Sequence, residues 1–529
     1  MSTLAPAAPA SASTDPNTDT AFGARMRHRL KEMLANPWSF LPSYEDRYQA
    51  LMRHASTLTP HQAYAMTMLL GKDSTRGYPD MPSTAALQFP RVNKVDAASQ
   101  FGWYYFAGVA TGMDGREYGV LCMYFRYSLL PPPMARQLGL TDEQNQIIDL
   151  QLSIAVDGGA FHQVDPVVTA GTSGRVHLSD ELFLRADGGS VEALEPGKPF
   201  PLRLRAGGTD LGEAEPVELE IDFTFGSSRG YLLQGWDGAE PLVGGIGTRY
   251  YSIPGLVLDP GASTLRIGGS AVPLEKGTFW FDHQWGNGLV PSGAPRPEVM
   301  RASANLQPPQ GKGWDFFALN LDGPVAFTFN SLHDQSSLPF MQQTGPTPPG
   351  VMTSPVVGKY MDPAGTVFNV SGTLRIAKWR KTDHTPNAAK YPNTPTWVPH
   401  GWEFTLTEAV VPERLRRLTL EPLSDSANTL FFANGSQYVE AAVRIRDAGG
   451  EAVGHGFAEA TAYADNLHNV LHLAGLPADL APIFAAEPPS PLMKLLSTLY
   501  MLKPSNQAAL KKLIACGSFP PPARPTDCG

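Results

Sequence analysis

From about residue 89 to residue 465 the sequence is a long succession of short segments in which apolar and polar residues alternate. Turns that contain glycine separate many of these segments, as at residues 157–159, 187–189 and 237–238. Alternation with a period of two predicts strands with one buried face, and evenly spaced strands with such turns are typical of closed or sandwich-like antiparallel sheets. The sequence therefore predicts a mainly β protein.

A segment rich in proline and glycine at residues 291–313 interrupts the strands, which indicates a boundary between two β domains near residue 300. Apolar residues recur at helical spacing on both sides of the strand-rich region, and we expect both helical regions to pack on the β domains. The predicted organisation is a disordered tail, a helical extension, a first and a second β domain, and C-terminal helices with a tail, at residues 1–20, 21–88, 89–300, 301–465 and 466–529, respectively.

Charge and cysteine content limit the classes of partner. The 41 basic and 50 acidic residues give a net charge of −9, which argues against a nucleic-acid-binding protein. The three cysteines are too few for a disulfide scaffold and lack metal-binding spacing. The N-terminal segment does not resemble a secretory signal and no apolar stretch is long enough for a transmembrane helix, so we expect a cytoplasmic protein. Basic residues at 25–31 leave peripheral membrane contact open, although a solvated helix face is their commoner role.

The segment GTFWFDHQWG is the most unusual in the chain. On a strand, His283 would share one face with Phe281 and Trp285, so that a proton-transfer group would lie between two aromatic side chains. Asp282 would lie on the opposite face with Trp280. An aromatic pocket of this kind could bind a hydrophobic ligand and stabilise a carbocation against ring faces. The alternative is a core strand, in which His283 bonds a backbone carbonyl and Asp282 bonds buried backbone or tryptophan indole groups from the second domain.

Further motifs accompany this segment in order along the chain. They are GWYYFAG, DGREYGVLCMYFR, YYSIPGL, GWDFF, YVEAAV and GHGFAE, which begin at residues 102, 114, 250, 313, 438 and 454, respectively. Together these motifs resemble the lipocalin-like family of hydroxyneurosporene synthase, also called carotenoid 1,2-hydratase, which includes lipocalin-like Diels–Alderases and kievitone hydratase. The resemblance covers residues from about 90 to 465.

The resemblance implies two lipocalin-like antiparallel β-barrel or sandwich domains, with the helical extensions outside them. It implies catalytic roles for His283 and Asp282, without a cofactor. The residues expected to contact the substrate are Trp280, Phe281, Trp285, Tyr251, Trp103, Tyr105, Trp314, Glu440 and Glu459.

Glu440 and Glu459 lie in strands that are otherwise apolar or small. Burial would raise the pKa of both carboxyls, so that they could act as acids. The alternative is an ion pair with Arg444 or Arg126.

We therefore expect a cofactor-free enzyme that acts on a hydrophobic isoprenoid- or polyketide-like substrate by alkene hydration, dehydration, isomerisation or cyclisation. Residues 326–330 lack the Tyr-x-Asp acid that the family's hydratases supply, which leaves the reaction type open. No metal is expected, because the pair His468 and His472 has no visible third ligand. The alternatives are a non-catalytic carrier of a hydrophobic small molecule and an interaction scaffold whose terminal helices dock a partner.

Overall fold

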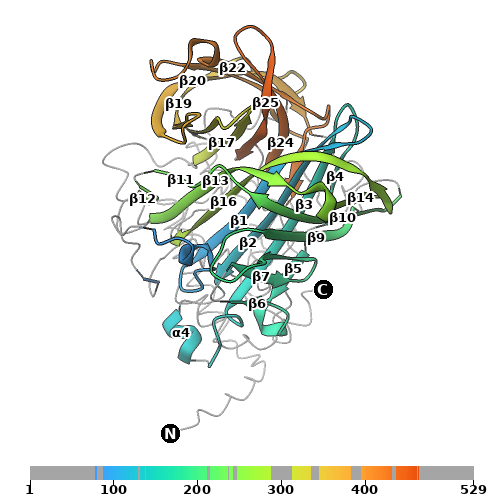
Figure 1. The fold of residues 1–529 in the computed structure, drawn as a ribbon, viewed down its shortest axis with the longest axis vertical. Helices are drawn as coiled ribbons and strands as arrows, with labels where there is room; N and C mark the ends of the chain where they lie inside the picture. The colour runs from blue at the N-terminus through green and yellow to red at the C-terminus, as the bar shows by residue number, and fades with distance from the viewer. Residues whose placement is uncertain are drawn as a thin grey trace, which may run out of the picture.

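The computed structural model describes residues 78, 79, 87–461 and 463, apart from residues 129–131, 138, 166, 180–181, 211–214, 236, 242–246, 288–311, 335–344, 383–394 and 432–436. The predicted disordered tail and nearly all of both helical extensions lie outside the described residues. Within them, no helix is long and apolar enough to cross a membrane. The described chain is mainly β, as predicted, and its strands form two antiparallel sheets (Figure 1).

The first sheet is curled into a half-barrel. Its strands follow the order β4-β3-β2-β1-β16-β13-β10-β9-β8-β7-β6, with β5 on β3, β11 and β12 on β13, and the β14–β15 hairpin on β10. The strands are β1 (Phe101–Gly112), β2 (Glu117–Ser128), β3 (Gln146–Val156), β4 (Phe161–Gln163), β5 (Val167–Ala170), β6 (His177–Leu178), β7 (Phe183–Ala186), β8 (Gly189–Ala193), β9 (Leu202–Asp210), β10 (Val217–Ser227), β11 (Leu232–Leu233), β12 (Ala239–Pro241), β13 (Gly247–Leu258), β14 (Thr264–Ile267), β15 (Ser270–Val272) and β16 (Leu274–Asn287). Short helices connect them: η3 (Arg91–Asn93), α4 (Pro132–Gln137), η4 (Gly171–Ser173) and η5 (Pro260–Ala262).

The second sheet closes into an eight-stranded barrel. Its strands follow the order β22-β21-β20-β19-β18-β17-β25-β24, and β22 pairs with β24 to complete the circle, while β23 pairs on the side of β24. The strands are β17 (Lys312–Leu321), β18 (Ala326–Asp334), β19 (Met352–Met361), β20 (Val367–Lys381), β21 (Trp397–Leu406), β22 (Arg417–Pro422), β23 (Thr429–Phe431), β24 (Gln437–Arg446) and β25 (Ala452–Thr461), with η8 (Glu413–Leu415) before β22.

The predicted pair of barrel or sandwich domains needs one correction. The second sheet is a closed barrel, whereas the first stays open between β4 and β6 in the part of the chain that the structure describes. These two edge strands have only three and two residues, which is too short for a ladder that would close the sheet. The predicted domain boundary near residue 300 lies between β16 and β17, outside the described residues, and stays a prediction.

The strands of the half-barrel have two buried faces with different neighbours. On β1, Tyr104 and Phe106 belong to the core of the half-barrel. Tyr105 and Ala107 point to the opposite face and pack with barrel residues, among them Ala442. Because β1 is buried on both faces, its sequence is an almost continuous apolar run rather than an alternating one.

A segment before β1 packs on the core of the half-barrel. The Tyr104 hydroxyl donates to the Asn93 carbonyl at 2.6 Å, and the Tyr251 hydroxyl donates to the Asn93 side chain at 2.6 Å. Phe89 stacks on Tyr231 with ring centroids 3.7 Å apart. The two hydroxyls and the stacked ring hold residues 89–93 against the same face that carries His283.

Candidate active site

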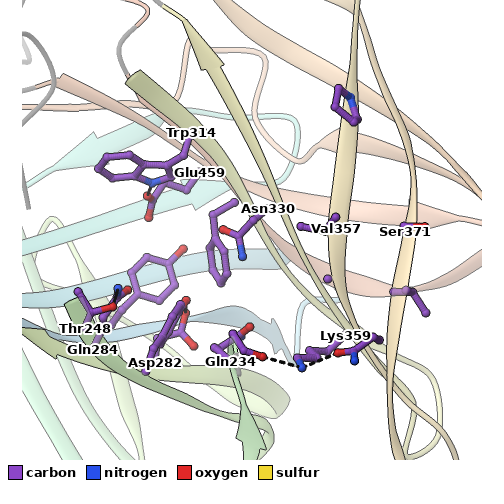
Figure 2. Close-up of a pocket in the computed structure, with 18 of the residues that line it drawn as sticks. Gln234, Thr248, Asp282, Gln284, Trp314, Asn330, Val357, Lys359, Ser371 and Glu459 are labelled. Carbon is purple, nitrogen blue, oxygen red and sulfur yellow. Dashed lines mark hydrogen bonds between the residues drawn. The ribbon is translucent and has the colours of Figure 1, made fainter. Parts of the chain in front are cut away.

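A cavity of about 920 Å³ lies between the half-barrel and the barrel. The half-barrel contributes side chains from β1, β13 and β16, and the barrel contributes side chains from β17 to β20 and from β25 (Figure 2). Aromatic walls and separate polar groups both border the cavity. The residues that line the cavity include Trp103, Tyr105, Gln234, Tyr250, Asp282, Trp314, Phe316, Val357, Lys359 and Glu459.

Asp282 is the carboxyl that the half-barrel presents to this cavity. Its carboxylate accepts hydrogen bonds from the Trp280 indole at 2.7 Å, the Tyr250 hydroxyl at 2.9 Å and the Ser252 hydroxyl. Burial raises the pKa of Asp282 to about 7, even though these three donors act to lower it. A carboxyl with this pKa exchanges a proton readily near neutral pH. The indole that bonds Asp282 belongs to Trp280 of the same strand, and not to the second domain as the alternative expected.

Glu459 is the carboxyl that the barrel presents to the same cavity. It accepts a hydrogen bond from the indole of Trp314, and burial raises its pKa to about 7. Glu440 lies beside it on β24, fully buried, and accepts a hydrogen bond from the Tyr105 hydroxyl at 3.1 Å. Burial, reinforced by the charge of Glu459, raises the pKa of Glu440 well above its usual range.

The alternative of ion pairs for these two glutamates is not what the structure shows. Arg444 instead pairs with Glu117 and Asp157. Arg126 is buried and donates to the Ser99 carbonyl and to the Gln146 side chain at 2.6 Å. Among the described residues, neither glutamate therefore has a basic partner, and both raised pKa values agree with the expectation from sequence.

A polar group lies toward the other side of the cavity. Lys359 on β19 donates to the Gly235 carbonyl at 3.0 Å and to the Asn369 side chain at 2.6 Å (Figure 2). Partial burial lowers the pKa of Lys359. Both partners are neutral oxygens, so the ammonium keeps its net charge available to an oxygen atom of a ligand.

The face of β16 that carries His283 does not line this cavity. Phe281, His283, Trp285 and Tyr251 all belong to the half-barrel core. The His283 imidazole hydrogen-bonds the backbone of Val92, and burial lowers its pKa well below the usual range. This position matches the core-strand alternative given above. A catalytic role for His283 and substrate contact by its three neighbours stay predictions.

The eleven residues expected from sequence thus fall into three groups. Five of them line the cavity: Trp103, Tyr105, Asp282, Trp314 and Glu459. Two of them, Trp280 and Glu440, are buried next to lining residues. The remaining four form the packed face described above. The sequence analysis missed Tyr250 and Lys359. Tyr250 could have been found from the YYSIPGL motif, because it precedes Tyr251 and lies on the opposite face of the strand. Lys359 belongs to no motif.

The described residues hold no group of three histidine, cysteine, aspartate or glutamate side chains that could bind a metal ion. The lining residues also form no phosphate-binding loop or other recognisable cofactor cradle. Proton transfer within an apolar enclosure is the chemistry that these residues can supply on their own.

Comparisons with known proteins agree with the fold. The family model described as AttH-like matches residues 80–345, about half of the chain. No curated protein matches the sequence. The solved structure of AttH from Nitrosomonas europaea is 18% identical, with a TM-score of 0.51, and the match covers 73% of this chain and 99% of that one. Kievitone hydratase from Nectria haematococca and CghA with Sch210972 are each 12% identical, with TM-scores of 0.45 and 0.32, respectively. Each of these two matches covers 74% of this chain and 96% of the other.

At these identities the structural likeness concerns the fold alone. Because the AttH-like family model matches half of the chain, the chain belongs to the AttH-like family.

Proposed function

We propose that the protein is a cofactor-free enzyme that transfers protons to and from a hydrophobic alkene bound between the two sheets. The proposal rests mainly on the position and the pKa of Asp282. It is a buried carboxyl that faces an aromatic cavity, and burial raises its pKa to about 7. The resemblance of the sequence motifs to a family of hydratases and Diels–Alderases supports the same class of substrate.

The proposed chemistry begins with protonation of a carbon–carbon double bond. The Asp282 carboxyl gives its proton to one alkene carbon, and a cation forms on the neighbouring carbon. The faces of Trp103, Trp314 and Phe316, which line the cavity, stabilise this cation through their π electrons. Water can then add with loss of a proton, which hydrates the alkene, or a second C–H bond can lose its proton, which moves the double bond. In both cases a carboxylate takes up one proton for the one that was delivered.

The cavity also favours a substrate with one polar end. The Lys359 ammonium has three N–H donors, and two of them donate to Gly235 and Asn369, which leaves one for an oxygen atom of the substrate. This donor would hold a carbonyl or carboxylate oxygen and so fix the position of the alkene relative to Asp282. An apolar chain that ends in an oxygen-bearing head therefore fits the cavity best.

The proposal is tested by incubating the protein in D₂O with a panel of prenyl alcohols and linear polyene acids. Mass spectrometry of the recovered lipids then measures the deuterium bound to carbon. The wild-type protein should incorporate deuterium, and Asp282→Asn should lower the rate by about 100-fold or more, the usual contribution of a general acid. The matched control is Asp142→Asn, an exposed aspartate outside the cavity, which should keep the wild-type rate.

Two outcomes contradict the enzyme proposal. Native mass spectrometry that shows a bound lipid, without any deuterium incorporation by the wild-type protein, favours the carrier alternative. Incorporation that persists in Asp282→Asn at the wild-type rate excludes Asp282 as the acid.

A further inference from the structure

Two buried glutamates lie side by side on the barrel wall of the cavity. Glu440 on β24 is directly opposite Glu459 on β25 in the antiparallel register. Glu440 is fully buried and Glu459 is partly buried, and no lysine, arginine or histidine pairs with either of them in the part of the chain that the structure describes. The titratable groups that influence them or are influenced by them are Tyr105 on β1, Tyr438 on β24, Asp282 on β16 and Asp315 on β17, and none of these is a cation.

The contacts of the two carboxyls differ. Glu459 accepts from the Trp314 indole and lines the cavity. Glu440 accepts from Tyr105 at its Oε2 atom and does not line the cavity. Its Oε1 atom is buried and has no donor among the described residues. The two glutamate side chains are within hydrogen-bonding reach of each other, and a carboxyl oxygen without a donor is satisfied when it carries a proton and donates it to a neighbouring carboxyl.

Two carboxylates in contact at a buried site cannot both be ionised, because each disfavours the charge on the other. The proton belongs on Glu440, which is the more enclosed of the two and has no indole donor to stabilise a negative charge. Glu459 then carries the charge, since Trp314 and the protonated Glu440 both donate to it.

We infer that Glu440 and Glu459 share one proton, that Glu459 is the base facing the substrate, and that Glu440 is a positioning residue that holds Glu459 as a carboxylate. This inference rests on the proposed function and narrows it. In this arrangement the acid, Asp282, lies on the half-barrel wall of the cavity, and the base, Glu459, lies on the barrel wall.

An acid and a base on opposite walls fit the migration of a double bond, or a cyclisation that ends in proton loss. The Asp282 proton forms a C–H bond at one alkene carbon, and the π electrons of the double bond are used in that bond. A C–H bond next to the resulting cation then breaks, its electrons form the new double bond, and its proton goes to Glu459. Asp282 is left as a carboxylate and Glu459 as an acid. Exchange with water then restores the starting protonation, since the cavity is open at Val357, which is 61% exposed.

The inference is tested on the protein without any ligand. Side-chain carboxyls labelled with ¹³C on glutamate are followed by NMR as a function of pH, in the wild-type protein and in Glu440→Gln and Glu440→Met. The glutamine keeps a hydrogen-bond donor next to Glu459, so the titration midpoint of Glu459 should stay within about half a unit of the wild-type midpoint. The methionine has a similar volume without a donor, so the midpoint should rise by about one unit or more.

The opposite result has a clear meaning. If Glu440 were the ionised partner, both substitutions would remove a negative charge, and the titration midpoint of Glu459 would fall in both variants. That outcome overturns the inference. The exposed Glu403 serves as control, because Glu403→Gln should leave the Glu459 midpoint unchanged.

A second measurement keeps the test decisive if Glu440→Met fails to fold. The infrared band of a protonated carboxyl should persist in the wild-type protein at about pH 9, where ordinary carboxyls are ionised, and should be weaker by one carboxyl in Glu440→Gln. A wild-type protein without this band overturns the inference. Because neither measurement uses a substrate, a failure here is distinct from a failure of the deuterium experiment.

Discussion

Asp315 allows a quantitative test of how this protein buries acids. The side chain is 1% exposed, on the face of β17 that points into the barrel, and the Tyr463 hydroxyl lies 3.2 and 3.1 Å from its two oxygens. Burial raises the pKa of Asp315 from 3.8 to about 8, with a further increase from the charge of Glu459, although the hydrogen bond from Tyr463 acts to lower it. The folded protein therefore holds Asp315 as the neutral acid at pH 7, whereas the unfolded chain ionises it.

The sign of the effect follows from proton binding. Because the pKa is higher in the folded state, the stability that this group contributes is complete below pH 3.8 and is lost as the pH rises through about 8. Each unit of pKa difference corresponds to about 1.4 kcal/mol, so the whole effect on the free energy of unfolding is roughly 6 kcal/mol. Asp315→Asn keeps an oxygen for Tyr463 and removes the titration. The free energy of unfolding of the variant, relative to that of the wild type, should therefore increase by about 1.4 kcal/mol for each pH unit from about pH 5 to about pH 8.

Urea unfolding, followed by tryptophan fluorescence at several pH values, measures this difference. Asp322→Asn is the matched control for the loss of one carboxyl, because Asp322 is exposed in the turn between β17 and β18. If the curves of wild type and Asp315→Asn run parallel across this pH range, the carboxyl is already ionised in the folded state, and the reasoning about buried acids in this protein is wrong.

Three further predictions concern other sites. His283→Ala should lower the free energy of unfolding by about 2–4 kcal/mol, because it leaves a hole in a packed core and removes the bond to Val92; a thermal midpoint equal to that of the wild type would count against this core role. Glu117→Gln should destabilise the protein at neutral pH, with a cost that shrinks as the pH falls from 4.5 towards about 2, because hydrogen bonding to His455 and pairing with Arg444 lower the pKa of Glu117 to about 2; thermal melts across this range should show the convergence. Treatment with EDTA should leave deuterium incorporation unchanged, and activity restored by an added divalent ion would refute the metal-free proposal.

Local sequence patterns predicted the strands well because the information they need is local. Alternation and glycine turns mark each strand, and the segment that became β16 separates its two faces as a period of two requires. Closure of the barrel was not predictable in this way. It depends on the pairing of β22 with β24, and the match between those strands is set by the curvature of the whole sheet.

The candidate site shows the same limit. Composition alone cannot say which face of β16 borders a cavity, because both faces are apolar enough to be buried and the second sheet decides between them. The aromatic neighbours of His283 pointed to the face of β16 that packs in the half-barrel core, whereas the described cavity borders the opposite face. Lys359 was missed because one lysine on an alternating strand resembles a solvent-exposed position. Glu440 and Glu459 were recognisable as candidates, since a carboxyl within a run of small and apolar residues is unusual and draws attention to its partner.

The place of the cavity follows from how the two sheets are filled. Large side chains such as Phe281 and Phe317 occupy the interior of the half-barrel and of the barrel, so neither interior resembles an empty ligand-binding barrel. Where the outer faces meet through small residues, the sheets touch: a Cβ atom on Gly119 would lie 2.0 Å from that of Ala442. Around the cavity the facing residues are large or polar, and space remains between them. Asp282 and Glu459 reach this space from different sheets, so the proposed acid and base come together only when both sheets are folded and in contact.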